Sequence, residues 1–195
     1  MRKIHREEVK SLPEYEPLRD RLRREVIELK KTRRVSVGDA VTLVFENRQT
    51  VLHQIHEMMR AEHVYDEQQI RHEIETYNHL IPDDGELSAT LFIEVADPQE
   101  IKPTLDRLYG IDNGRSVFLR LDGVSPIPAV FEEGHSDESK ISAVHYVRFR
   151  LDESARRALG NGSQPALVID HPGYRGETPL REETRRELLK DLEPA

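Results

Sequence analysis

The sequence predicts an α+β fold, with a helical N-terminal region over residues 1–85 and a sheet-based region over residues 86–195. Two patterns predict this division. Up to about residue 80, apolar residues recur at three- and four-residue spacing, which is typical of amphipathic helices. From residue 86 onward, short runs rich in β-branched and aromatic residues are separated by turn residues, which is typical of strands. A chain of 195 residues can bury a sizeable core, so we expect the two regions to pack as one compact unit.

Three helices are expected in the N-terminal region, at residues 14–32, about 40–63 and about 66–80. Asp39 is a favourable N-cap for the second helix, because its carboxylate can accept the free backbone N–H groups of the first turn. The Ile-Pro-Asp-Asp-Gly run at 81–85 ends the third helix. Three consecutive amphipathic helices favour a small antiparallel bundle.

The C-terminal region is expected to alternate strands and helices. Strands are predicted at 89–95, 116–121, 129–132, 142–151 and 165–170, and helices at about 97–109, 152–159 and 180–192. The order is β-α-β, an inserted strand, then β-α-β and a final helix. This order predicts a ferredoxin-like mixed sheet of split βαβ type, with one inserted strand and a C-terminal helix.

Composition narrows the possible chemistry and location. The chain has no cysteine, which excludes disulfides, thiolate nucleophiles and cysteine-ligated metal centres. It has no long apolar run, and its charged N-terminus does not look like a secretory signal, so we expect a cytoplasmic protein without a membrane partner. Residues 1–34 carry 12 Lys or Arg against 7 Asp or Glu, although the whole chain has a net charge of −8. Such a basic arm can dock onto the acidic body of a neighbouring subunit in a homo-oligomer or onto an anionic partner. The alternative is a basic helix exposed to water.

Several common site motifs are missing. No Gly-x-Ser-x-Gly elbow, Gly-x-Gly-x-x-Gly turn or Walker-type loop occurs, so serine-nucleophile and nucleotide chemistry are not expected. Aromatic and arginine side chains on the predicted sheet resemble an RNA-binding face, but the acidic body and the missing basic-aromatic signature argue against nucleic-acid binding.

Two histidines of the sheet region are candidate catalytic or metal-binding residues. In the strand at 142–151, His145 shares a face with apolar residues, so it is expected to be at least half buried. His171 follows the last predicted strand in a tight loop. If the two strands are neighbours, His145, His171 and Glu94 converge into a site for a divalent metal ion or a small anion. The alternative is that His145 is a hydrogen-bonded core residue.

The second predicted helix offers another set of polar residues. Glu46, His53 and Glu57 lie within a narrow arc of a helical projection, and His53 and His56 are three apart. Metal ligands on a helix need such spacing. No Glu-x-x-His pair of the di-iron bundle type occurs in these helices. We therefore interpret this face as exposed to water.

Short blocks distributed along nearly the whole chain resemble the DUF3501 family, a bacterial family of unknown function. The blocks are KKTRRVSVG at 30–38, FENRQT at 45–50, QIHEMMR at 54–60, YNHLIP at 77–82, ATLFIE at 89–94, SAVHY at 142–146 and DHPGY at 170–174. Any one block is weak evidence, but seven in the same order are specific.

The resemblance implies a setting and a set of positions. Members of the family look like genomic neighbours of rubrerythrin-type di-iron proteins and iron–sulfur oxidoreductases, which implies a role in oxidative stress. The resemblance implies that a polar stripe on the second helix forms a buried polar network or a surface that faces a partner. It comprises Glu46, Asn47, Arg48, Thr50, Gln54, Glu57 and Arg60, and its counterparts in the sheet are Glu94, His145, His171 and Tyr174.

Three functions remain open at this point. The first is an accessory or interaction protein of a bacterial redox or iron-linked stress system. It would bind a rubrerythrin-type or iron–sulfur protein, or a divalent metal ion. The second is an enzyme with His145 or His171 as general acid–base and with Glu94 or Glu57 orienting it. The third is a structural homodimer. The sequence identifies no substrate.

Overall fold

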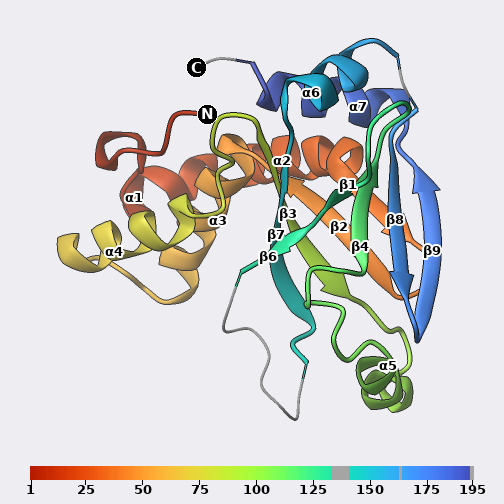
Figure 1. Ribbon diagram of the computed structural model, residues 1–195. Helices are drawn as coiled ribbons and strands as arrows, with labels where there is room; N and C mark the ends of the chain where they lie inside the picture. The colour runs from red at the N-terminus through yellow and green to blue at the C-terminus, as the bar shows by residue number, and fades with distance from the viewer. Residues whose placement is uncertain (133–140, 163, 194–195) are drawn as a thin grey trace.

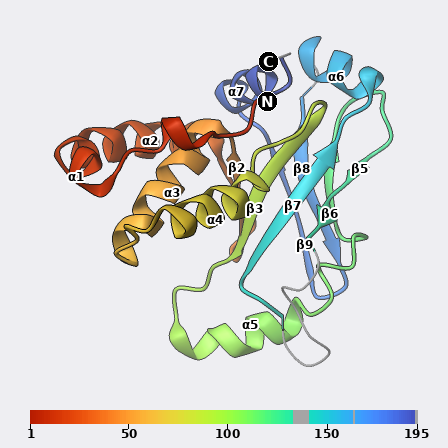
Figure 2. The same ribbon diagram turned by 90° about the vertical axis from the view of Figure 1, so that its left-hand side faces the viewer.

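The computed structural model describes residues 1–132, 141–162 and 164–193. Its helices and strands form layers (Figures 1 and 2). The N-terminal helices cover the outer face of one sheet, and a second sheet faces the inner side of the first. Helices α6 and α7 lie at one end of the two sheets, and α5 lies at the other.

Two antiparallel sheets form the centre of the molecule. The first has the order β1-β2-β3-β7-β6, and the second has the order β5-β4-β8-β9. Their bounds are β1 Arg34–Val37, β2 Val41–Glu46, β3 Glu86–Ile93, β4 Val117–Arg120, β5 Ile127–Pro128, β6 Val130–Phe131, β7 Val144–Arg150, β8 Ala166–His171 and β9 Tyr174–Pro179. Strands β5 and β6 follow each other directly, so this segment passes from the second sheet to the first.

Tyr174, at the start of β9, connects the second sheet to the first sheet at the turn between β1 and β2. Its hydroxyl donates to the carbonyl of Val37 at 2.6 Å and accepts the N–H of Ala40 at 3.0 Å. Both groups flank the turn between β1 and β2, where Gly38 has a φ of +67°. A side chain at Gly38 would also collide with the Tyr174 ring, so this turn requires glycine twice over. Tyr174, one of the positions to which the family resemblance points, therefore has a structural role: its hydrogen bonds hold the two sheets together.

The helices frame these sheets. Their bounds are α1 Leu12–Tyr15, α2 Arg19–Arg33, α3 Arg48–Ala61, α4 Glu67–Asn78, α5 Ile101–Arg107, α6 Glu153–Gly160 and α7 Glu182–Asp191, with short 3-10 turns at Arg6–Glu8, Glu16–Leu18 and Pro98–Glu100. Within the described residues, no helix combines the length and the apolar character that crossing a membrane requires.

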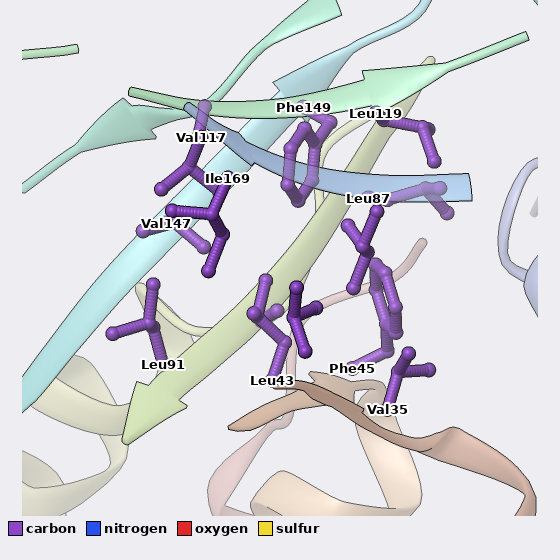
Figure 3. Packing of buried hydrophobic residues seen from close by; sticks show 14 of the residues in the cluster. Val35, Leu43, Phe45, Leu87, Leu91, Val117, Leu119, Val147, Phe149 and Ile169 are labelled. Carbon is purple, nitrogen blue, oxygen red and sulfur yellow. The ribbon is translucent and has the colours of Figure 1, made fainter. Parts of the chain in front are cut away.

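The main core lies between the two sheets. Figure 3 shows its side chains, with Leu43, Leu87 and Phe149 from the first sheet facing Leu119 and Ile169 from the second. These side chains are almost completely shielded from water, so their burial is the largest favourable contribution to the stability of this layer.

A second apolar cluster joins the N-terminal helices to the outer face of the first sheet. It contains Ile55 and Met59 of α3 and Ile74 of α4, with Tyr146 of β7 packed against them. The helices therefore form a layer on the sheet, and β2, from the predicted helical region, pairs along its length with β3.

The predicted helix at about 40–63 is wrong over its first turns. Residues 41–46 form β2, in which every residue is buried, and Asn47 caps α3 by accepting the N–H groups of Gln49 and Thr50. Asp39 lies in the turn before β2 and caps no helix. A continuous apolar run does not distinguish a strand buried on both faces from a buried helix, and this run is rich in β-branched valine.

The predicted ferredoxin-like mixed sheet is also wrong. All strand pairs in the described residues are antiparallel. The strands on either side of α5, β3 and β4, belong to different sheets, and so do β7 and β8 on either side of α6. Each β-α-β segment thus crosses from one sheet to the other instead of returning to its own. Strands β1 and β9 were also missing from the predicted order, and with them the two-sheet architecture.

Candidate functional site

The two histidines of the sheet region are core residues. His145 is 1% exposed, and its Nε2 lies 2.8 Å from the carbonyl oxygen of Ser142. His171 is also buried. Its Nδ1 accepts the N–H of Gly173 at 3.1 Å, so its Nε2 carries the proton and donates to the carbonyl of Tyr109 at 3.0 Å. Both rings hold nearby backbone in place.

Glu94 does not join these histidines. Its carboxylate, half exposed, accepts a hydrogen bond from Arg34 at 2.5 Å across the surface of the first sheet. Because β7 and β8 lie in different sheets, the condition for convergence of His145, His171 and Glu94 is not met. Among the described residues, no group of three or more histidine, aspartate or glutamate side chains is placed to hold a metal ion.

The polar stripe predicted on the second helix instead reaches in several directions. Arg48 pairs with Glu8 of the N-terminal segment, and Arg60 donates to Glu16 at 2.7 Å. Gln54 hydrogen bonds to Tyr77 of α4. Helix α3 is thus held by polar contacts to the segment before it and to the helix after it. Both interpretations of the stripe, a polar network and a partner-facing surface, stay predictions, because the Arg60–Glu16 pair is exposed to water while Glu46 is buried.

Glu46 is the most deeply buried member of the stripe. It lies at the end of β2, is 2% exposed, and accepts hydrogen bonds from the hydroxyls of Thr50 at 2.5 Å and Thr90 at 2.8 Å. Thr50 lies in the first turn of α3 and Thr90 lies on the neighbouring strand β3, so this carboxylate links the start of a helix to the sheet. The cluster has little access to water, and its role in the fold is to fix where α3 leaves the sheet.

Glu57 is the centre of a second polar cluster, on the side of α3 that faces α1 and α2. Arg19 donates to both of its carboxylate oxygens, at 2.8 and 2.7 Å, and the Tyr15 hydroxyl donates to Oε1 at 2.8 Å. The hydrogen bonds from the Arg19 guanidinium are the main reason that the pKa of Glu57 falls to about 2. Glu57 is therefore a carboxylate at any physiological pH.

Two histidines of α3 complete this cluster. The Tyr15 hydroxyl lies 3.2 Å from Nδ1 of His53, and the Tyr15 ring stacks on the ring of His56 at 4.5 Å. Nε2 of His56 accepts the N–H of Lys10 at 2.9 Å. Burial lowers the pKa of His56 to about 4 and also lowers the pKa of His53, so both rings are neutral near pH 7. Burial likewise raises the pKa of Tyr15.

A cavity of about 110 Å³ opens beside these histidines, between α2, α3 and the N-terminal segment. Its lining includes the apolar side chains of Leu22, Val26 and Leu52 and the two histidines His53 and His56. Lining residues with polar side chains are Glu8, Lys10, Glu25 and Gln49. Small-molecule sites typically combine apolar walls with a few convergent polar groups, and titratable groups with shifted pKa values gather at such sites. We call this space the α2–α3 cavity, and it is the candidate functional site.

Sequence reasoning identified Glu57 but missed the group around it. Neither Tyr15 nor Arg19 belongs to any candidate set that the sequence predicts. His53 and His56 were recognised only as a weak metal pair facing water. The signal that would have helped is the mixed character of the Tyr15 ring, which needs a partner for its hydroxyl when it is buried.

The fold and this site define an α+β protein with helices layered on two facing antiparallel sheets, and with a small histidine-lined cavity in the helical layer. Residues 3–192 match the family described as "Protein of unknown function (DUF3501)", and the chain belongs to that family. A crystal structure of a novel protein of unknown function from Burkholderia pseudomallei K96243 is similar, with 34% sequence identity and a TM-score of 0.91. The similarity covers 98% of this chain and 100% of that one. No curated protein matches the chain.

Proposed function

We propose that this protein is an accessory protein that binds a small ligand in the α2–α3 cavity. The observation that supports this is the cavity itself, where apolar walls meet two neutral histidines and the lysine Lys10. A site of this composition suits a compact, mostly apolar molecule with one polar end, because the walls remove apolar surface from water and the histidines fix the orientation.

The other candidate residues support this choice indirectly. His145 and His171 are buried and bonded to backbone carbonyls, so an enzyme built on either ring would first have to break a contact of the core. His53 is linked to a carboxylate, because the Tyr15 hydroxyl contacts both His53 and Glu57. If the protein is an enzyme with a histidine as general acid–base, His53 in the α2–α3 cavity is therefore a better candidate than His145 or His171.

The proposed setting is a bacterial redox or iron-linked stress system, with a rubrerythrin-type or iron–sulfur protein as partner. The support for this setting is the family resemblance. A direct test is to mix the purified chain with a purified rubrerythrin and to measure binding by calorimetry. The same preparation, analysed for metal content and for mass by light scattering, tests a bound metal ion and the proposed homo-oligomer.

Ligand binding in the cavity is tested by thermal unfolding against phenol, indole, imidazole and benzoate. The variant Leu52→Phe places extra volume in the cavity, and Leu189→Phe makes the same change at a part-buried leucine of α7 outside it. We expect at least one compound to raise the unfolding temperature of the wild type and of Leu189→Phe, but not that of Leu52→Phe. Equal responses in all three proteins, or no response to any compound, would contradict the proposal.

A further inference from the structure

The hydrogen bonds around Tyr15 determine which nitrogen of His53 carries a proton. Tyr15 has one hydroxyl hydrogen, and it points to the Glu57 carboxylate, which can only accept. Toward His53 the Tyr15 oxygen must therefore act as acceptor, so the hydrogen of that 3.2 Å contact belongs to Nδ1 of His53. In a neutral imidazole the other nitrogen then has a free lone pair. Nε2 of His53 is thus a hydrogen-bond acceptor.

This acceptor is available to a ligand. His53 lines the α2–α3 cavity, and its Nε2 makes no hydrogen bond to any residue that the structure describes. The ring is held from behind by Tyr15, which is itself completely buried and held by Glu57. A histidine acts as a proton acceptor when neighbouring groups fix its tautomer and orientation. Here Tyr15 and Glu57 are those groups.

The charges around His53 are mixed in sign, and those of α2 that act on its ring are positive. Lys30, Arg19 and Arg23 of α2 all act on the ring, and Glu57 is the acidic group that opposes them. Lys10 adds another positive charge at the cavity. The carboxylates of Glu8 and Glu25 also line it, and they are paired with Arg48 and Arg21. The cations favour a negative charge on a molecule bound beside His53. Burial by itself lowers the pKa of His53, and that negative charge, together with the Glu57 carboxylate, opposes this effect.

We propose that the α2–α3 cavity takes a weakly acidic ligand with a phenol- or enol-type O–H group, whose proton is accepted by Nε2 of His53. This inference rests on the proposed function of the cavity and identifies the class of ligand. The ligand O–H bond breaks, its electron pair stays on the ligand oxygen, and a new N–H bond forms at Nε2. His53 contacts the ligand, while Tyr15 and Glu57 are positioning residues.

The test uses para-nitrophenol with the full-length chain, at a pH below the pKa of this phenol. Its visible absorbance reports the ionised form, while the total amount bound is measured by equilibrium dialysis. Three variants dissect the site. Tyr15→Phe removes the hydroxyl between His53 and Glu57, Tyr77→Phe removes a half-buried tyrosine hydroxyl outside the cavity, and His53→Gln removes the base.

We expect the wild type and Tyr77→Phe to bind nitrophenol largely as its anion. In Tyr15→Phe the ratio of bound anion to bound neutral phenol should fall about tenfold, since a hydrogen bond to a charged group is lost. In His53→Gln the bound phenol should be neutral. Binding of neutral phenol by the wild type, or an unchanged ratio in Tyr15→Phe, would overturn the role of His53 and leave cavity binding intact. Absence of binding in the wild type would overturn both.

Discussion

Protonation of His56 should destabilise the folded protein in mild acid. The ring is 3% exposed, stacks on Tyr15, and accepts the N–H of Lys10 through Nε2. A proton on Nε2 would place two N–H groups against each other and would charge a ring that has little access to water. Burial accordingly lowers the pKa of His56 from 6.5 to about 4 in the folded state.

The size and sign of the effect follow from this shift. Between the two pKa values the unfolded chain binds a proton at residue 56 that the folded chain does not, so the free energy of unfolding falls as the pH falls. The loss begins near pH 6.5 and is complete below about pH 4. From about pH 7.5 to about pH 4.5 this one group should lower the free energy of unfolding by about 2.5 kcal/mol.

Urea unfolding at both pH values measures this contribution. The variant His56→Phe keeps the stacking on Tyr15 but has no titrating ring, so it should lose about 2.5 kcal/mol less than the wild type over the same interval. His72→Phe changes an exposed histidine of α4 and should follow the wild type. If His56→Phe and the wild type lose the same stability between the two pH values, the assignment of this acid sensitivity to His56 is refuted.

Other parts of the structure lead to three further expectations. Arg33 is fully buried and donates to the Phe45 carbonyl and to Asp191 of α7. In urea unfolding, Arg33→Met should cost about 3–5 kcal/mol by leaving the Asp191 charge buried, and adding Asp191→Leu should recover much of the loss; an additive double variant would contradict this. The pKa of Glu57 lies near 2, so the extra stability of wild type over Glu57→Gln should be present above pH 4.5 and vanish as the pH falls toward 2; a constant difference in acid titrations would contradict it. His171→Gln should lower the unfolding temperature without changing nitrophenol binding, since its ring bonds backbone far from the α2–α3 cavity; loss of binding in dialysis would count against a purely structural role.

Local patterns predicted most of the secondary structure. The helices predicted to begin near residues 66, 97 and 152 do begin there, and the side chains of Asp66, Asp97 and Asp152 accept backbone N–H groups of their first turns. The alternation predicted for the strand at 142–151 correctly buries the face of His145, which also carries Val147 and Phe149. These features depend on residues close in sequence, so a single chain is enough to recognise them. The error at residues 41–46 has the same origin, because a run that is buried on both faces has no period to read.

The arrangement of the strands could not be predicted in this way. Whether a strand after a helix returns to the same sheet depends on which surface it buries, and both alternatives give the same local pattern. Here the hairpin of β8 and β9 belongs to a second sheet that faces the first, and Tyr174 hydrogen bonds this hairpin to the turn before β2. That contact joins residues 134 positions apart. The short, polar strand β9 carries little apolar signal of its own, since half of its residues are exposed.

The candidate site shows the same division between local and distant information. Spacing on one helix brought Glu57 and His53 together, because residues four apart share a face. What gives them chemical meaning is Tyr15, which is 38 positions from His53 and reaches it only when the N-terminal segment packs on α3. The sequence predicts that this helix face is exposed to water. There, no neighbouring group would fix which ring nitrogen of His53 carries the proton. Burial under Tyr15 fixes the proton on Nδ1 of His53 and exposes its Nε2 to the cavity, so the folding of the N-terminal segment itself creates the proposed proton acceptor.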